Sequence, residues 1–492
     1  MSTLRSEAFS SRIARRNSKR RWRPDATRQQ IVNSLYNIMR GLISLAVGFY
    51  FRRIERFHAE RVPATGPVLF VSNHPSSLND SFVIGASVGR KVNFMATVQL
   101  FRFPPLKWLL LHCGVIPVNR VKDDPKAMRS VMDTFEACFR VLERGEAVGI
   151  FPEGITHDDP QLKEVKSGAA RMALELEHRH GGKLGLQIVP VGLTFSAKEI
   201  YRSEALVNFG EPIRAAEFLA GYEAERKECI RRLTHEIETR IQNLILHLPQ
   251  LEHARVVGAV QRLYLDRLRV GNRVIHEPVS RQAEDLLLAQ AISKAVEIAF
   301  EQYPERAAAF VTKLDFYERW LKRLKVSDEA LAEFPDPKKL LGSSLFRCVL
   351  AVLGAPVAFY GWIHRFIPVR IVRYAVTFTE ASKRKAQTPH AKMIGGIVAF
   401  APCYLVYAVI FHQFFGWPAS LWYGLSLPVS GMIAYYYIRN LRRLGAAVRN
   451  TTILFRAPLA VRRLLRLRSE LIAEIESLRP EIQSRFQAGQ EG

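Results

Sequence analysis

A histidine and an aspartate follow an apolar run in the segment VLFVSNHPSSLND, residues 68–80. A histidine side chain has an unperturbed pKa of about 6.5, so His74 could act as a general base near neutral pH. A carboxylate such as Asp80 could fix the tautomer of the ring and stabilise the imidazolium. Such a base can take a proton directly from a substrate hydroxyl. The same two residues could instead cap a turn after a strand.

Three other stretches with polar or turn-forming residues follow in order: GVIPVNR at 114–120, FPEGITHD at 151–158 and VPVGLTF at 189–195. Arg120 has planar, permanently charged donors that suit a phosphate group. A turn containing Glu153 and Gly154 would bring a carboxylate and backbone amides to one place. Each residue also has a structural interpretation: Arg120 as a surface ion pair, Glu153 as a turn residue, and Pro190 as the end of a strand.

Other chemistry has less support in the sequence. The histidines of the HRH stretch, residues 178–180, have no third metal ligand at suitable spacing, so we expect no metal site. Ser72 and Ser76 flank His74, but no Gly-x-Ser-x-Gly elbow of a serine hydrolase is present. The five cysteines have no CxxC spacing, which predicts neither a disulfide framework nor a zinc site and fits a reducing compartment.

The elements that would position His74 alternate between two periodicities. Between residues 66 and 213, short strand-like runs such as PVLFVSN and LQIVPVGLTF alternate with helical stretches such as SGAARMALELEHRH. This alternation predicts an α/β domain with a mostly parallel sheet. Chemistry in such domains gathers at the carboxyl ends of the strands, and His74 lies at one of them.

Two long apolar segments, residues 393–416 and 419–438, contain no Lys, Arg, Asp or Glu. Each is long enough to cross a bilayer, and two residues separate them, so we expect a transmembrane helical hairpin. Basic residues flank it on both sides, which predicts that both ends are cytoplasmic. A shorter apolar segment, residues 348–363, could be a third span or a re-entrant or interfacial helix. We expect it not to span, because a third span would place His74 outside the cell.

The net charge suggests an anionic partner. The chain has 71 Lys and Arg against 46 Asp and Glu, a formal charge of +25. Nucleic acid is one such partner, but no aromatic-interleaved RNA motif or zinc finger is present. Cytoplasmic flanks, anionic lipid and phosphorylated substrates explain the charge as well. We therefore expect membrane lipids and no nucleic acid as partners, and a membrane-anchored nucleic-acid-binding or scaffold protein is the distant alternative.

The ordered blocks around His74, Arg120, Glu153 and Pro190 resemble those of the glycerolipid acyltransferase superfamily. The resemblance covers residues 63–213 and includes the stretches KSGAARMAL and VNFGEPI. The commonest family form has four residues between the histidine and the aspartate, whereas five intervene here and Asn79 occupies the usual acid position. The longer spacing is similar to that of a branch of glycerol-3-phosphate and dihydroxyacetone-phosphate acyltransferases with C-terminal membrane segments. We assign the acid role to Asp80, with Asn79 as the fallback.

The resemblance implies a membrane-bound O-acyltransferase in phospholipid biosynthesis. It would move a fatty acyl group from acyl-CoA or acyl carrier protein to glycerol 3-phosphate or dihydroxyacetone phosphate. The alternative acceptor is 1-acylglycerol 3-phosphate (lysophosphatidic acid), which would give phosphatidic acid. The implied roles are catalysis by His74 and Asp80, acceptor binding by Arg120, Glu153 and Gly154, and shaping of the acyl-donor pocket by Pro190. No metal or redox cofactor is expected.

The predicted organisation has six parts. They are a basic disordered arm at 1–29, an interfacial amphipathic helix at 30–57, the acyltransferase α/β domain at 58–228, a helical appendage at 229–341, a membrane region at 342–440 and a basic amphipathic tail at 441–492. The 30–57 helix could lie on anionic lipid or pack on a soluble core. In either case we expect an integral membrane protein with its catalytic domain on the cytoplasmic face.

Overall fold

The structure is a computed structural model that describes residues 26–118, 128–157, 159–198, 200–271, 280–333, 337–377 and 388–488. The predicted arm at 1–29 lies almost wholly outside these ranges. Within them, eight strands form one sheet in the order β1-β7-β6-β2-β5-β3-β4, with β8 beside β6. The strands are β1 Arg53–Phe57, β2 Val68–Ser72, β3 Val92–Thr97, β4 Ile116–Val118, β5 Ala147–Ile150, β6 Gln187–Phe195, β7 Glu204–Phe209 and β8 Ile213–Arg214.

The centre of the sheet is parallel, and one side of it is mixed. Strand β2 pairs in parallel with β5 and β6, and β3 pairs in parallel with β4 and β5. Strands β7 and β8 pair antiparallel with β6, and β1 pairs in parallel with β7. The predicted α/β domain is therefore confirmed as a mixed sheet, with His74 directly beyond the end of the central strand β2.

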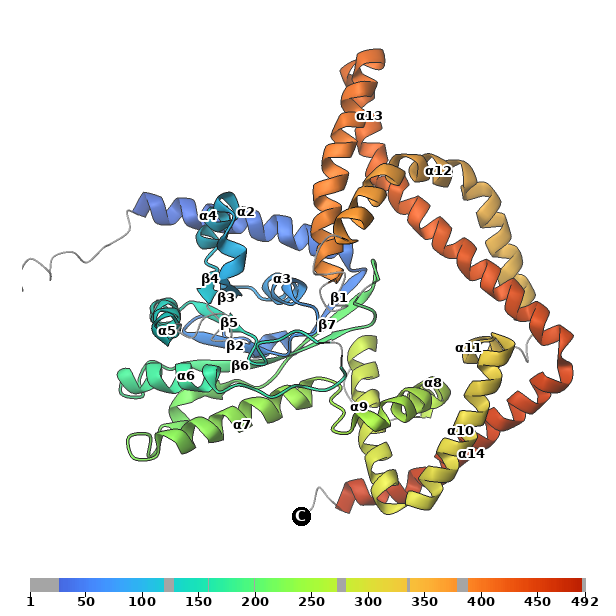
Figure 1. Cartoon of the computed structure of the whole chain (residues 1–492), viewed down its shortest axis with the longest axis horizontal. Helices are drawn as coiled ribbons and strands as arrows, with labels where there is room; N and C mark the ends of the chain where they lie inside the picture. The colour runs from blue at the N-terminus through green and yellow to red at the C-terminus, as the bar shows by residue number, and fades with distance from the viewer. Residues whose placement is uncertain are drawn as a thin grey trace, which may run out of the picture.

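Helices cover both faces of the sheet (Figure 1). They are α2 Ala26–Tyr50, α3 Leu78–Ser87, α4 Pro104–His112, α5 Met128–Leu142, α6 Gly168–Arg179 and α7 Arg226–Leu244. In β2, Leu69 and Val71 join the core formed with α5, α6 and α7. Val68 and Phe70 join the core formed with α2 and α3. All five β2 residues are buried, as expected for a parallel strand covered on both faces.

The predicted helix at 30–57 ends early, because α2 stops at Tyr50 and residues 53–57 form strand β1. The RIERF sequence of β1 does not alternate strictly: Glu55 is buried, Ile54 and Phe57 are half-buried, and Arg53 and Arg56 are exposed. Arg202 fixes the end of α2 by donating to the carbonyls of Gly48, Phe49 and Phe51 at 3.4 to 3.5 Å. Tyr50 and Phe51 lie in the core, while Leu42 and Leu45 are exposed. Helix α2 is thus partly a core helix and partly an exposed apolar surface.

Two predicted boundaries in the C-terminal half are wrong. Helix α7 belongs to the core of the sheet domain through Leu233, Ile237 and Ile241, so that domain does not end at 228. The tail from 441 is not separate either, because α14 Pro458–Ala488 shares a core with three helices of the appendage. These are α8 Ala254–Gly271, α9 Arg281–Gln302 and α10 Pro304–Leu324. Helix α11 Asp328–Glu333 packs beside them.

The remaining helices are α12 Pro337–Thr377 and α13 Thr388–Arg456. Helix α13 is interrupted at Gly416, where φ is 75° and ψ is 173°. The parts on either side contact each other, since the rings of Phe411 and Tyr423 stack at 4.2 Å between centroids. In the described parts of the chain, one helical stretch, Val398–Asn450, is long and apolar enough to cross a membrane. The predicted segment 348–363 lies inside α12.

Candidate active site

His74 lies just beyond β2, at the carboxyl end of the parallel strands. Its ring stacks on Phe151, which follows the neighbouring strand β5, with 4.1 Å between ring centroids. Its Nδ1 lies 2.8 Å from Oδ2 of Asp80. Asp80 is in the first turn of α3, where the positive end of the helix dipole favours a negative charge. The structure therefore brings the two predicted catalytic residues into direct contact.

The contact determines which ring nitrogen is available for chemistry. An ionised carboxylate only accepts hydrogen bonds, so Nδ1 of His74 donates to Asp80 and Nε2 keeps its lone pair. The backbone N–H of Ser76 also donates to Asp80 Oδ2, at 2.8 Å. The His74 side chain remains 16% exposed, whereas that of Asp80 is fully buried. Burial raises the pKa of the Asp80 carboxyl, and the hydrogen bond from His74 opposes that rise.

Asn79, the fallback partner, does not contact His74. Its side chain is fully buried, and both of its amide atoms have no hydrogen-bond partner among the residues described. The Ser72 hydroxyl donates to the carbonyl of Asn73 at 3.1 Å, and the buried Ser76 hydroxyl has no hydrogen-bond partner among the described residues. Asp80, which follows His74 after five intervening residues, is the acid that contacts the histidine ring.

Glu153 holds the backbone of His74. Its Oε1 accepts the N–H of His74 at 2.8 Å, and its Oε2 accepts the N–H of Lys163 at 3.0 Å. Oε2 also contacts Nε2 of His157. The carboxylate is buried and both of its oxygens have partners within the chain, and the contact with an acceptor hydroxyl stays a prediction. In this structure Glu153 therefore binds the backbone of His74.

Gly154 is required by the turn that carries Glu153. Its φ is +67°, in the left-handed region, and a Cβ there would lie 2.7 Å from Nζ of Lys166. Lys198 donates to the carbonyls of Pro75 at 2.6 Å and His157 at 3.2 Å, and so ties the His74 loop to the Glu153 loop. Two lysine side chains, Lys166 and Lys198, therefore lie around the turns that hold the His74–Asp80 pair.

Comparisons with known proteins identify the kind of domain that carries this site. Residues 53–194 match the Acyltransferase family model. These residues therefore form an acyltransferase domain. The chain is 22% identical over 437 residues to an uncharacterized acyltransferase of Schizosaccharomyces pombe, covering 71% of this chain and 62% of that one.

Two other relatives carry more specific names. A chloroplastic 1-acyl-sn-glycerol-3-phosphate acyltransferase of Arabidopsis thaliana is 32% identical over 164 residues, covering 33% of this chain and 41% of that one. Glycerol-3-phosphate O-acyltransferase 1 of Saccharomyces cerevisiae is 24% identical over 329 residues, covering 49% and 43%. The chain thus spans less than two thirds of the length of each of these three relatives.

The acyltransferase domain has further supports that sequence reasoning missed. The side chain of Asn73 brackets Leu193 on β6, donating to its carbonyl at 3.0 Å and accepting its N–H at 2.8 Å. His157 and Lys198 are also new to the site. An asparagine directly before the histidine is a weak signal, and nothing in the sequence marks Lys198.

The two other predicted site residues have different outcomes. Arg120 lies outside the described residues. Pro190 lies within β6, opposite Val71 of β2, and its carbonyl accepts the N–H of Gly210 at 2.9 Å. Because the N and O of one strand residue point to the same side, the missing N–H of Pro190 faces the break between β7 and β8. Pro190 is therefore tolerated inside the sheet and interrupts no pairing with β2.

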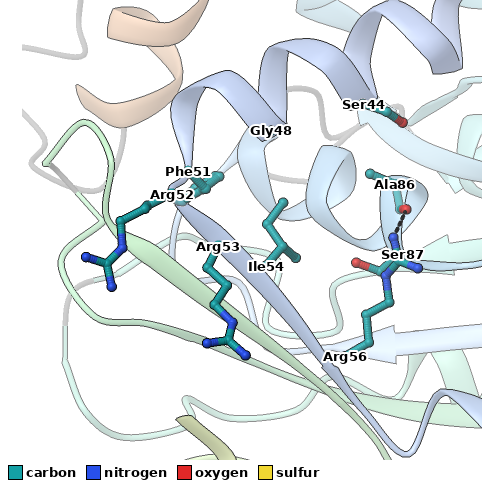
Figure 2. A pocket seen from close by; sticks show the side chains of 9 residues that line it. All are labelled: Ser44, Gly48, Phe51, Arg52, Arg53, Ile54, Arg56, Ala86 and Ser87. Atoms are coloured by element: carbon teal, nitrogen blue, oxygen red, sulfur yellow. Dashed lines mark hydrogen bonds between the residues drawn. The ribbon is translucent and has the colours of Figure 1, made fainter. Parts of the chain in front are cut away.

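A separate cavity of about 240 Å³ lies where α2, β1 and α3 meet, and three arginines line it (Figure 2). Arg52 pairs with Glu204, and Arg53 pairs with Glu55 at 2.7 Å. Arg56 donates to the carbonyl of Ala86, near the end of α3 remote from Asp80. These arginines already have partners, and neither His74 nor Asp80 lines this cavity.

Proposed function

We propose that the protein transfers a fatty acyl group from an acyl thioester to a hydroxyl of glycerol 3-phosphate or dihydroxyacetone phosphate. The observation that supports this most is the His74–Asp80 pair at the carboxyl end of β2, with Nδ1 held by the carboxylate and Nε2 available. The alternative acceptor, 1-acylglycerol 3-phosphate, presents the same phosphate and hydroxyl groups. The names of the relatives include both classes.

In the proposed mechanism, Nε2 of His74 takes the proton from the acceptor hydroxyl as its oxygen attacks the thioester carbonyl. The Asp80 carboxylate stabilises the imidazolium that forms. Collapse of the tetrahedral intermediate breaks the carbon–sulfur bond. The imidazolium then returns its proton to the departing thiolate of CoA or acyl carrier protein. These steps balance without a metal or a redox cofactor.

Cationic side chains around the turn would hold the acceptor phosphate. Lys166 extends over Gly154, and Lys198 lies between the carbonyls of Pro75 and His157. Arg120 is the sequence-based candidate for the same role. A phosphate at this position would place a neighbouring hydroxyl within reach of His74, which is how binding orients the reaction.

We also propose that residues 393–416 and 419–438 cross the membrane as a helical hairpin. The stacked rings of Phe411 and Tyr423, and the approach of Tyr404 to Gly431, support antiparallel packing across the break at Gly416. Segment 348–363 would stay non-spanning, and α2 would lie on the anionic lipid surface. Basic residues on both flanks favour cytoplasmic ends and a cytoplasmic catalytic domain.

The test is acyl transfer by the full chain in nanodiscs. Labelled acyl-CoA or acyl carrier protein is offered with glycerol 3-phosphate, dihydroxyacetone phosphate or 1-acylglycerol 3-phosphate in parallel. We expect lysophosphatidic acid from the first acceptor. His74→Ala and Asp80→Asn should each lower the rate by about 10²- to 10⁴-fold, whereas Asn79→Ala should stay within about tenfold of the wild type. Phosphatidic acid alone would select the alternative acceptor, and full activity of His74→Ala would reject the mechanism.

A further inference from the structure

A cavity of about 690 Å³ lies among α8, α9, α10 and α14, in the lower part of Figure 1. Its volume is within the range of about 300 to 1,000 Å³ that is usual for ligand pockets. None of His74, Asp80 and Glu153 lines it, and all four helices lie outside residues 53–194. The cavity is therefore separate from the acyltransferase site.

The walls of this cavity are suited to an alkyl chain. Helix α9 contributes Ala291, Ala295 and Ala299, which are spaced by four residues and so lie in a row on one helix face. Their small side chains leave a trough along the helix. Larger apolar side chains from the other three helices line the opposite walls, among them Val260, Phe310 and Ile482. When an apolar chain replaces water in such a trough, the free energy of the system falls, which favours binding.

Among the described side chains that line the cavity, one is a cation. Arg479 lines it together with Gln483 and Ser484, all from α14. The carboxylates of Glu474 and Glu481, also on α14, are paired with Arg306 of α10 at 3.0 and 3.2 Å. Arg479 forms no ion pair with any residue in the described ranges, so its charge is available to an anionic group at the end of the trough.

We propose that this cavity binds one long-chain acyl amphiphile, with the alkyl chain along the alanine row and a single anionic head group on Arg479. The head group is a carboxylate or a phosphate, as in a fatty acid or 1-acylglycerol 3-phosphate. One cation at the end of an apolar trough matches the charge and shape of such a molecule. The site is non-catalytic and does not depend on the reaction proposed for His74.

The experiment uses the full chain in nanodiscs and a 16-carbon fatty acid that carries a photoreactive diazirine. After irradiation and digestion, we expect cross-linked peptides from residues 288–300 of α9 and 475–484 of α14. Ala295→Trp fills the trough and Arg479→Gln removes the cation, and each should reduce these cross-links about tenfold. The matched controls Ala473→Trp and Arg462→Gln, which change exposed residues of α14 outside the cavity, should leave the cross-links unchanged.

Competition identifies the head group. Displacement of the probe by unlabelled palmitate alone indicates a carboxylate ligand, and displacement by 1-acylglycerol 3-phosphate indicates a phosphate ligand. The proposal is overturned if neither peptide is cross-linked, or if the cross-links persist in both cavity variants. It is also overturned if the cavity proves to be an interface, so that Ala295→Trp abolishes a dimer and no cross-link forms. Arg479→Gln decides the outcome should Ala295→Trp fail to fold.

Discussion

Asp80 is a buried carboxylate with one oxygen well satisfied and the other not. Oδ2 accepts from His74 and from the backbone of Ser76, while Oδ1 has no hydrogen-bond partner among the described atoms. Burying a charge without full hydrogen bonding destabilises a fold. The carboxylate is nevertheless what allows His74 to become an imidazolium during the proposed reaction. Activity and stability therefore make opposite demands on this residue.

Stability should show this conflict as a dependence on pH. Because burial raises the pKa of Asp80 above its unfolded value, the native state holds the proton more tightly, and stability from this group is lost as pH rises through the native pKa. Asp80→Asn removes that dependence while keeping an oxygen that accepts from His74. We expect the melting temperature of Asp80→Asn, relative to the wild type, to increase between pH 4 and pH 7. A constant difference across this range would contradict the argument.

Glu153→Gln tests whether this residue positions His74 or contacts the acceptor. The new amide group would face the backbone N–H of either His74 or Lys163, leaving one donor unsatisfied at a cost of about 1 to 3 kcal/mol. We expect a lower melting temperature and a lower kcat with little change in KM for the acceptor. Glu164→Gln, which changes an exposed residue of the same segment, is the control. A large rise in KM at unchanged kcat would show instead that Glu153 contacts the acceptor.

At this scale the sequence predicted the residues better than their roles. His74 and Asp80 are close in the chain, and a strand end followed by a helix leaves few ways to place them. The role of Glu153 depends on a hydrogen bond across 79 positions, and that of Asn73 on one across 120 positions. Local spacing carries no information about such bonds, because they depend on which strands become neighbours in the sheet.

The helices and strands follow the periodicity of the sequence, except where a short strand begins just after a helix. The RIERF stretch follows α2 after two intervening residues and does not alternate strictly between charged and apolar residues, so the sequence alone predicts a helix that continues through it. Similarly, the sequence predicts α7 as part of a helical appendage and α14 as part of a basic amphipathic tail, but each has an apolar face that packs in a core. Such a face is visible in the sequence, whereas its packing partner is not.

Close packing between α12 and α13 gives a prediction at the scale of elements. A Cβ on Gly361 of α12 would lie 2.0 Å from the carbonyl oxygen of Ser430 on α13. Gly361→Ala should therefore push the two helices apart and cost about 1 to 3 kcal/mol. Gly396→Ala on α13 is the matched control, since no atom of the described residues outside its own helical turn lies within 4 Å of its Cβ position. The measurement is thermal unfolding in nanodiscs, and equal melting temperatures for the two variants would contradict close packing.

At the scale of the whole molecule, a small aromatic cluster joins the acyltransferase domain to α13. Arg202 donates to the hydroxyl of Tyr436 at 2.8 Å, and the hydroxyl of Tyr435 donates to the carbonyl of Tyr201 at 2.7 Å. The rings of Tyr201 and Tyr435 meet edge to face at 4.9 Å. Because Arg202 also binds the end of α2, one turn connects the sheet, α2 and α13.

Removing two hydroxyl groups should weaken this contact between the acyltransferase domain and α13 without unfolding the domain or the helix. The double variant Tyr435→Phe, Tyr436→Phe keeps the rings but loses two hydrogen bonds, worth about 1 kcal/mol each. We expect amide exchange of Arg202, whose N–H binds the carbonyl of Tyr50, to accelerate about tenfold or more. Tyr437→Phe is the control, because that hydroxyl donates to Ala351 of α12. Unchanged exchange in the double variant would mean that the two tyrosine hydroxyls contribute little to the stability of the turn at Arg202.

The three consecutive tyrosines have a further consequence if α13 crosses the bilayer as proposed. Tyrosine is favoured at the level of the lipid head groups, so residues 435–437 would fix the vertical position of α13. The turn at Tyr201 and Arg202 would then hold His74 at a constant height above the membrane. Because this anchor lies at the near head-group level, that height, and the distance a lipid must rise to meet His74, would stay the same in a thicker or thinner bilayer.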